Sequence, residues 1–182
     1  IKGVQRPGLA TILPCPTKPV VMCDVGANAD CKPAYLVQFA SMASLYIEKV
    51  LGVPNPKVYL LNIGEEETKG SSFALECHEL LAQTIPNFAG NCEGRDLLTG
   101  ECDVVVTDGF TGNVALKTIE GVGSVLFGEM KRTFMSGLKN KIGAVLLKDG
   151  VKAIKDSVSA DTYGAAPILG VKGACMVGHG SS

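Results

Sequence analysis

Polar and glycine residues gather where a short apolar run changes into a helical pattern, at residues 108–113. The first backbone N–H groups of a helix lack intrahelical partners, and the macrodipole adds partial positive charge at the same point. Gly112 permits a close backbone approach, and Thr111 and Asn113 add side-chain donors. Lys117 adds a positive charge about one turn later. This pattern is typical of a site that binds an anion.

The same residues also have a purely structural interpretation. Thr and Asn are common at helix starts, because their side chains accept a hydrogen bond from an unpaired backbone N–H group. Thr111 can therefore cap the helix without any ligand. The turn alone leaves capping and anion binding open.

Repeated strand, turn and helix patterns predict the elements that position this turn. Residues 103–107 are a β-branched run short enough for a buried parallel strand, and helical spacing of apolar residues begins at Ala115. Strand patterns at 20–24 and 57–63 are likewise followed by polar turns and by helical patterns. Three alternations predict an α/β fold in which helices cover a parallel sheet. Right-handed crossovers place all three turns at one edge of the sheet, where ligands bind.

The boundaries of the first two of these helices can also be predicted. Pro33 suits the first turn of a helix that ends near Gly52, and residues 25–32 before it form a turn rich in Gly, Asn and Asp. The second helix is expected over residues 71–84. A short strand or edge segment is expected over Gly8 to Leu13.

The composition indicates a single globular α/β domain or a large fragment of one. The 182 residues carry a formal net charge of −1, which gives no reason to expect nucleic acid. No apolar run approaches the roughly 18 residues of a transmembrane helix and no secretory signal is evident, so we expect a cytoplasmic protein. Seven cysteines without a Cys-x-x-Cys pair indicate free, mostly buried thiols rather than a zinc site.

Other charged residues favour structural roles. The acidic run 65–67 is expected in a solvated loop, because a metal site needs convergent carboxylates. His78 has no second histidine at metal spacing. Arg95 can pair with Glu93 and Asp96 or bind an anion, and we favour the pairing.

Basic residues are concentrated late in the chain. Seven Lys and Arg residues stand against two acidic residues between Glu129 and Lys155. We predict a basic amphipathic helical hairpin over residues 131–157. Its surface suits an anionic membrane or an acidic protein, whereas a core-facing helix with a solvated lysine face explains the same pattern.

The end of the chain holds another set of candidate donors. Residues 174–177 predict a strand, and His179 and Ser181 follow it on a small-residue turn suited to phosphate. There is no Gly-x-Ser-x-Gly motif and no acidic residue at a telling spacing, so the sequence does not support a serine nucleophile.

Five stretches of the chain together resemble one protein family. They are DVGANADCKP from Asp24, LLNIGEEETKG from Leu60, GNCEGRDLL from Gly90, DVVVTDGFTGNVALKT from Asp103, and YGAAPILGVKG with GHGSS at the end. In this order they are similar to the carboxyl-terminal part of the bacterial phosphate acyltransferase family (PlsX). The resemblance implies a doubly wound α/β fold like those of phosphotransacetylases and isocitrate dehydrogenases, with a mostly parallel sheet and helices on both faces. Family members carry a further amino-terminal region and a final helix, so we expect this fold to be incomplete at both ends.

The resemblance implies transfer of a long-chain fatty acyl group from acyl carrier protein to inorganic phosphate, giving acyl phosphate for phospholipid synthesis. It also implies a homodimer, no metal or organic cofactor, and peripheral contact with the inner face of the membrane. Two alternatives stay open. One is a non-catalytic fragment that binds acyl carrier protein or membrane, and the other is a coenzyme A-dependent phosphotransacetylase.

These chemistries suggest roles for the turn residues. Phosphate can attack a thioester itself, so the site needs charge balance, oxyanion donors and a pocket for the chain. We expect Lys32 and Lys117 to balance the phosphate charge and Asn113 to donate to phosphate or to the oxyanion. His179 is expected to bind phosphate or protonate the leaving thiol, with capping of its turn as the alternative. Further contacts with phosphate or the acyl group are expected from Asn28, Asp108, Thr111, Gly112 and Ser181.

Overall fold

The β-branched runs form a seven-stranded sheet in the computed structural model, which describes residues 1–157 and 165–178. The strands are β1 (Gly8–Leu13), β2 (Val20–Cys23), β3 (Val58–Leu61), β4 (Phe88–Cys92), β5 (Val104–Val106), β6 (Ala166–Leu169) and β7 (Met176–Val177). The helices are α1 (Pro33–Val50), α2 (Ser72–Thr84), α3 (Gly109–Met135), α4 (Leu138–Leu146) and α5 (Lys148–Ser157), with a 3-10 helix η1 (Gly94–Leu98).

The sheet is mixed and mostly parallel. Its strand order is β4-β3-β5-β2-β1-β6-β7. The pairs β4-β3, β3-β5 and β5-β2 are parallel, whereas β1 is antiparallel to both β2 and β6, and β7 is antiparallel to β6. The predicted α/β class is confirmed. Since β2, β3 and β5 are parallel neighbours, the turns that follow them lie at one edge of the sheet, as the crossover rule requires.

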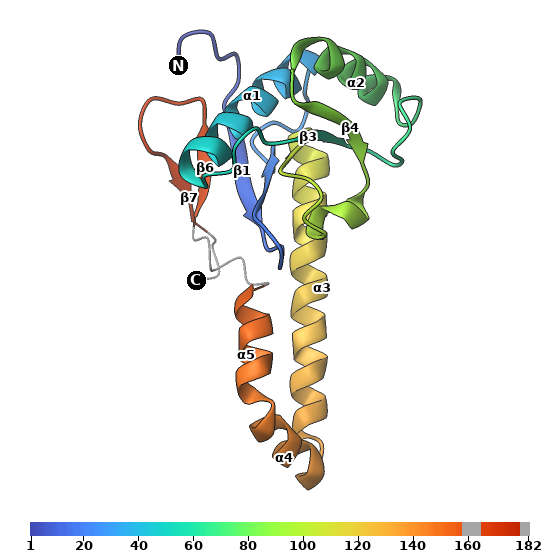
Figure 1. Cartoon of the computed structure of the whole chain (residues 1–182), viewed down its shortest axis with the longest axis vertical. Helices are drawn as coiled ribbons and strands as arrows, with labels where there is room; N and C mark the ends of the chain where they lie inside the picture. The colour runs from blue at the N-terminus through green and yellow to red at the C-terminus, as the bar shows by residue number, and fades with distance from the viewer. Residues whose placement is uncertain (158–164, 179–182) are drawn as a thin grey trace.

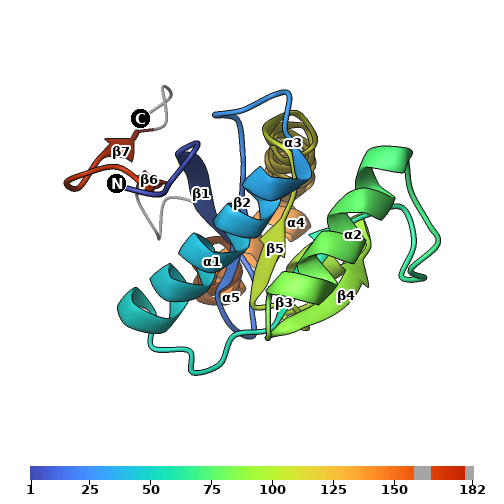
Figure 2. The same cartoon turned by 90° about the horizontal axis from the view of Figure 1, so that it is seen from above.

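Helices cover both faces of the sheet, as predicted. Residues of α1 and α2 pack with one side of the strands in a first hydrophobic cluster. Residues of η1 and the first turns of α3 pack with the other side in a second cluster, and Figure 2 shows this layering from above. Strand β5 illustrates the cause: Val104 and Val106 face the first cluster, Val105 faces the second, and all three are fully buried.

The residues at the starts of α1 and α2 explain why these helices begin there. Pro33 occupies the first helical position of α1, where its missing N–H group leaves no donor unpaired. Ser71 caps α2, because its hydroxyl oxygen accepts a hydrogen bond of 3.2 Å from the N–H group of Ala74. These starts confirm the helices predicted from residue 33 and over residues 71–84.

The antiparallel part of the sheet differs from the sequence prediction. Strand β1 lies inside the sheet, because it pairs with β2 on one side and β6 on the other. Strand β6 was not predicted, since its residues 166–169 include a proline. The strand expected at 174–177 is shortened to β7, which pairs with β6.

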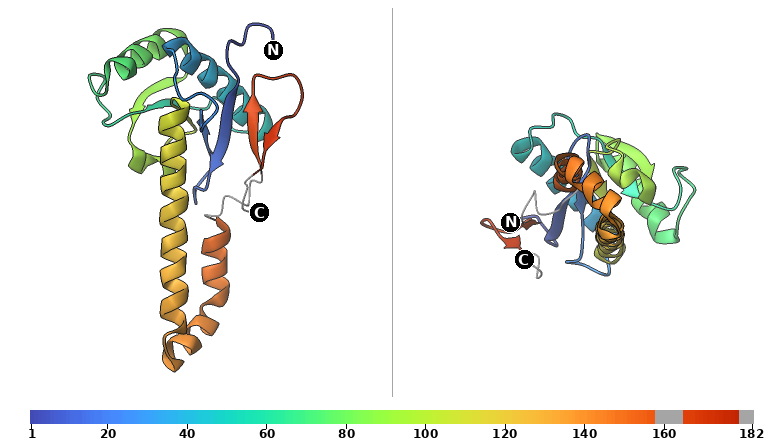
Figure 3. Two further views of the ribbon diagram at one scale, coloured as in Figure 1. Left: turned by 180° about the vertical axis from the view of Figure 1, so that it is seen from behind. Right: turned by 90° about the horizontal axis from the view of Figure 1, so that it is seen from below.

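Helix α3 no longer packs against the sheet beyond Ile119. Figures 1 and 3 show α3 running past the sheet and projecting from it, with α4 at the far end and α5 returning beside α3. We call residues 120–157 the helical extension and the remainder of the described chain the α/β body. The predicted pair of helices over 131–157 is therefore three helices, because Gly137 and Leu147 interrupt the helical pattern twice.

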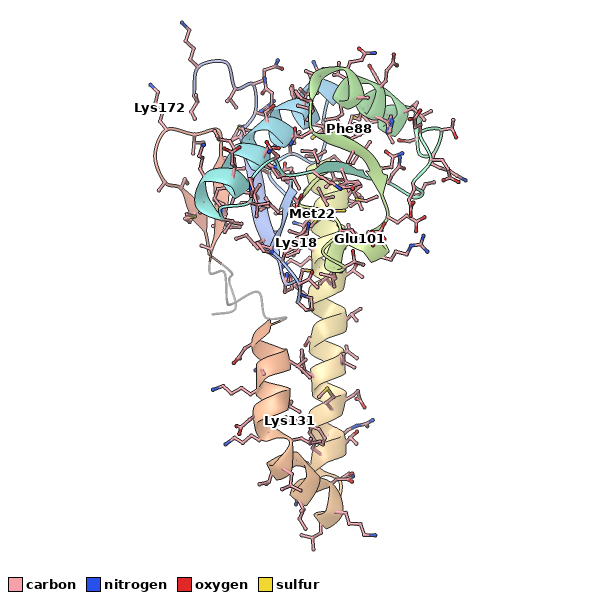
Figure 4. The ribbon with its side chains drawn as sticks, viewed as in Figure 1. Lys18, Met22, Phe88, Glu101, Lys131 and Lys172 are labelled. Carbon is pink, nitrogen blue, oxygen red and sulfur yellow. The ribbon has the colours of Figure 1, made fainter. Side chains whose placement is uncertain are left out.

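Many apolar side chains of the helical extension are exposed. More than half of the accessible surface of each of the following is open: Val122, Val125, Leu126, Met135, Leu138, Ile142, Val145, Leu146, Leu147 and Ile154. Figure 4 shows these helices with their side chains standing away from the body, and Lys131 lies among them. Within the two described ranges, no helix is both long enough and apolar enough to cross a membrane.

Candidate functional site

Two turns meet at the edge of the sheet where β2 and β5 end. The N–H group of Gly109, at the start of α3, donates a hydrogen bond of 2.7 Å to the carbonyl oxygen of Asn28 in the turn after β2. A Cβ atom at Gly109 would collide with the backbone of Asn28, and one at Gly112 would collide with the carbonyl group of Asp24. The two turns are therefore packed backbone against backbone, and glycine at both positions makes this contact possible.

A buried carboxylate organises the turn after β2. Asp24 is fully buried, and its Oδ1 accepts hydrogen bonds from the N–H groups of Leu9, Gly26 and Ala27, at 3.0, 3.2 and 3.1 Å. Its Oδ2 accepts from the backbone N–H group and the side-chain amide of Asn28, at 2.7 and 2.8 Å. Five donors thus satisfy a carboxylate that has no access to water. Sequence reasoning missed this role, although an aspartate directly after a buried strand and before a Gly-x-Asn turn could have indicated it.

Asp108, not Thr111, caps α3. Its Oδ1 accepts from the N–H group of Thr111 at 2.8 Å, and its Oδ2 accepts from the Thr111 hydroxyl at 2.7 Å. The helix begins at Gly109, whereas the sequence pattern suggested a turn through Asn113. The prediction was wrong here because two glycines in the first turn hid the helical pattern. A negative charge of the protein itself now lies at the start of α3.

Asn28 holds the first turn in place. Its amide nitrogen donates to the carbonyl oxygen of Pro7 and to Asp24, both at 2.8 Å, so both amide hydrogens are used inside the protein. The Cys31 thiol donates to the Asn28 carbonyl oxygen at 3.4 Å. The pKa of this thiol is raised to about 11, chiefly by burial and also by the nearby Asp24, Asp108 and Asp30, against a lowering hydrogen bond with Gly109. Cys31 is therefore a neutral thiol near pH 7.

Asn113 and Lys32 are the predicted site residues that remain open to a ligand. Asn113 is exposed, and its amide nitrogen lies against Gly26, where it would touch an added Cβ atom at 2.7 Å. The amide thus lies where the two turns meet. Lys32 is exposed at the residue before α1, and its side chain does not cap that helix.

Other predicted contacts are placed elsewhere. Lys117 is directed along α3, where its Nζ lies 2.8 Å from Oε2 of Glu120. Gly112 is buried beneath the first turn, so its part in the site is the close packing of backbone. His179 and Ser181 lie outside the described residues.

A separate pocket of about 270 Å³ lies between the start of α3 and the start of α2. Asp108 and Thr111 contribute to it from α3. The remaining lining residues are Leu36, Leu60, Leu61, Asn62, Ile63, Gly70, Ser71, Phe73, Ala74 and Thr107. The pocket therefore has an apolar interior with a few polar groups, as is usual for small-molecule sites.

The residues to which the sequence gave structural roles do have such roles. Arg95 pairs with Glu93 at 2.9 Å and lies 3.9 Å from Asp96. His78 is buried, and its Nδ1 lies 2.9 Å from Oδ1 of Asn91. All seven cysteines are free, and five of them are buried. In the described part of the chain, no group of three or more His, Cys, Asp or Glu residues is arranged to hold a metal ion.

Comparison with known proteins gives close relatives along the whole chain. The family model described as "Fatty acid synthesis protein" matches residues 1–182. The phosphate acyltransferase of a Synechocystis species is 50% identical over 186 residues, covering 100% of this chain and 53% of the relative. That of Clostridium novyi is 50% identical over 182 residues, covering 100% of this chain and 55% of the relative. The chain spans about half the length of these relatives.

The fold of this chain is similar to those of two solved phosphotransacetylase structures. The chain is similar to a phosphotransacetylase from Streptococcus pyogenes, with a TM-score of 0.55 and 15% identity over 68% of this chain and 44% of the other. It is also similar to the EutD phosphotransacetylase from Staphylococcus aureus, with a TM-score of 0.54, 17% identity and the same coverage. At this level of identity the likeness establishes the α/β fold alone.

Proposed function

We propose that this chain, which belongs to the fatty acid synthesis protein family, forms the phosphate-binding part of an acyltransferase. The reaction moves a long-chain fatty acyl group from acyl carrier protein to inorganic phosphate and yields acyl phosphate for phospholipid synthesis. The observation that carries the proposal is the exposed amide of Asn113 at the meeting of two tightly packed turns. Identity near 50% along the whole chain to proteins named phosphate acyltransferase supports it.

The chemistry needs no covalent intermediate. An oxygen atom of phosphate attacks the thioester carbonyl carbon, the carbonyl oxygen becomes an oxyanion, and the carbon–sulfur bond then breaks to release the thiolate. Lys32 balances the phosphate charge, and Asn113 donates to phosphate or to the oxyanion. Lys117, which pairs with Glu120 in the structure, turns from it to phosphate when phosphate binds. His179 binds phosphate or gives the thiolate its proton, and Ser181 adds a phosphate contact.

The two turns position these groups. Asp24 and Asn28 hold the first turn through the hydrogen bonds described above, and Gly112 lets the second turn pack against it. The carboxylate of Asp108 repels a bound anion, so phosphate lies on the Asn113 side of the α3 start. Asp108 and Thr111 face the neighbouring pocket and serve the acyl group.

Replacing Asn113 or Lys32 with Ala tests these roles. Each change should lower turnover at least tenfold, equivalent to about 1.4 kcal/mol in the barrier, without loss of helical content. Asn140→Ala in the helical extension and Lys49→Ala at the exposed end of α1 are matched controls and should keep the original rate. Unchanged turnover in folded Asn113→Ala would remove this residue from the site.

The helical extension supports proposals about partners. Its exposed apolar side chains favour a homodimer in which two extensions cover each other, and its lysines favour contact with acyl carrier protein or with the inner membrane surface of a cytoplasmic enzyme. Figure 1 places α4 at the end of the molecule away from the start of α3, which favours a contact surface over an acyl pocket. Sedimentation should give a dimer, and Leu126→Ser should weaken it.

The exposed apolar and basic side chains of the helical extension also favour a second candidate function, that of a fragment that binds a partner without catalysis. Such a fragment would bind acyl carrier protein or anionic vesicles and would form no acyl phosphate. Binding without turnover, in a preparation that is dimeric and folded, would favour that function over the transferase.

A further inference from the structure

A threonine hydroxyl in the pocket between the starts of α2 and α3 makes no hydrogen bond within the described residues. Thr107, directly after β5, retains 2% of its accessible surface and lines the pocket. Within the described residues its hydroxyl has no hydrogen-bond partner, whereas its backbone N–H and C=O groups are paired with Cys23 and Asp24. The hydroxyl can therefore form a hydrogen bond with a group that enters the pocket.

The direction of the Thr107 side chain follows from its surroundings. Its methyl carbon Cγ2 faces Gly112, where an added Cβ atom would approach to 2.9 Å. No fully enclosed side-chain nitrogen or oxygen atom of the described chain lacks a partner, so the Thr107 hydroxyl must be open to the pocket. The hydroxyl is therefore directed into the cavity and can donate to a group that lies there.

The remaining lining defines the chemistry of that group. Leu36, Leu60 and Phe73 give the pocket an apolar interior, and the lining contains no Lys, Arg or His. Asp108 contributes the one ionisable side chain of the lining, and it is negative. An anion is disfavoured in such a place, whereas an uncharged, mainly apolar ligand with a hydrogen-bond acceptor is favoured.

We infer that this pocket binds the carbonyl end of the fatty acyl group, with the Thr107 hydroxyl donating to the thioester carbonyl oxygen. The inference rests on the proposed transferase function and assigns the acyl part of the substrate. Thr107 and Thr111 line the pocket, and the amide of Asn113, two residues further along α3, lies against Gly26. The same hydrogen bond serves the oxyanion as the carbonyl oxygen gains charge.

The α2 start contributes to the same arrangement. Ser71 accepts from the N–H group of Ala74, so its own O–H group remains available to donate into the pocket. The carboxylate of Asp108 accepts two hydrogen bonds from Thr111, which fix its position in the lining. The polar groups are thus placed around one apolar space, which suits a group with a single polar end.

The experiment uses S-decanoyl-N-acetylcysteamine, an acyl thioester without carrier protein, labelled with carbon-13 at the thioester carbonyl. Binding to the 182-residue chain is titrated by nuclear magnetic resonance, with no phosphate present. The wild type should bind the probe and shift the carbonyl resonance downfield. Thr107→Val should abolish that shift and weaken binding about three- to tenfold, because one hydrogen bond is lost at nearly constant volume.

Two further variants make the result specific. Thr107→Ser keeps the hydroxyl and should keep the shift, whereas Thr118→Val removes a threonine hydroxyl on exposed α3 and should change nothing. An equal shift in Thr107→Val and wild type, or no binding by folded wild type, would overturn the inference. Binding with the expected shift but without acyl phosphate on adding phosphate would leave the pocket assignment intact and contradict the transferase function.

Discussion

In the α/β body the apolar faces of the helices pack against the sheet, whereas in the helical extension the apolar side chains of the helices are exposed. Five residues of α1 are completely buried, and α2 buries Cys77 and Leu81. In α4 no residue is buried, and the part of α3 beyond Ile119 exposes Val122, Val125 and Leu126. The body therefore has a core of its own, and the extension has an apolar surface that another molecule can cover.

The difference also separates the two kinds of function. Glycines and a buried carboxylate in the body fix two turns against each other, which keeps the candidate site rigid. Glycines in the extension have open space around them: an added Cβ atom at Gly121 or Gly128 would approach no side chain and no other element within 4 Å. Substitutions in the two regions should consequently have opposite effects on stability.

The largest effect is expected at the centre of the body, from Asp24→Asn. The side-chain NH2 group of the new Asn would face backbone N–H groups that now donate to the carboxylate, so those backbone donors would lose their acceptor. Because the position is fully buried, water cannot replace the lost hydrogen bonds. The free energy of unfolding should fall by about 3 kcal/mol. Urea unfolding measures it, with the exposed Asp30→Asn as the control that should stay within about 0.5 kcal/mol of wild type. Equal stability of the two variants would contradict the organising role of Asp24.

A somewhat smaller effect is expected from Gly112→Ala. The added Cβ atom meets the backbone carbonyl of Asp24, so α3 and the first turn must separate. The free energy of unfolding should fall by about 2 kcal/mol, and phosphate-dependent turnover should fall with it. Unfolding curves and rates of the same preparation check both. A fully stable Gly112→Ala would show that the two turns are not packed as tightly as the structure indicates.

The buried thiols make the body sensitive to alkali. Burial raises the pKa of Cys77 from 9.0 to about 12. The unfolded chain loses this proton first as the pH rises above 9, so the stability is fully present below pH 9 and falls as the pH rises towards 12. Between pH 8.5 and 10 Cys77 should account for a loss of about 1 kcal/mol. Cys77→Ala should reduce this slope, and Cys175→Ala, at an exposed position, should not.

The smallest effect, of opposite sign, is expected in the extension from Gly128→Ala. This exposed position lies inside α3, and an added methyl group has open space. The free energy of unfolding should rise by about 0.5–1 kcal/mol through helix propensity. If the extension unfolds separately from the body, the gain should appear in its own transition. A loss of stability at Gly128 would indicate that another molecule packs there, for example the second chain of a dimer.

The parallel part of the fold could be predicted from the sequence because each strand is short, apolar and followed by a polar turn and an amphipathic helix. Residues 103–107, 33–50 and 71–84 carried these patterns, and the structure has β5, α1 and α2 there. Strand β6 could not be predicted, because its place depends on pairing with β1, more than a hundred residues earlier in the chain. Long-range pairing leaves little trace in local periodicity.

The candidate site was predictable in position and less so in detail. The turns at 24–32 and 108–113 do meet, because their strands are parallel neighbours. The roles of Asp24 and Asp108 were missed, since burial and hydrogen-bond partners decide them and neither can be read from residue type. A short polar residue after a buried strand is the one signal that Asp24 and Thr107 share.

The most direct test of the account follows phosphate oxygen into the product. The chain is incubated with palmitoyl-acyl carrier protein and phosphate labelled with oxygen-18 at all four positions, with the Synechocystis relative in parallel. Attack by phosphate predicts acyl phosphate that retains all four labelled oxygens, formed together with an equal amount of free thiol, as mass spectrometry will show. Unlabelled fatty acid without acyl phosphate, or no product from the chain while the relative is active, would contradict the claim that these turns bind and orient phosphate for acyl transfer.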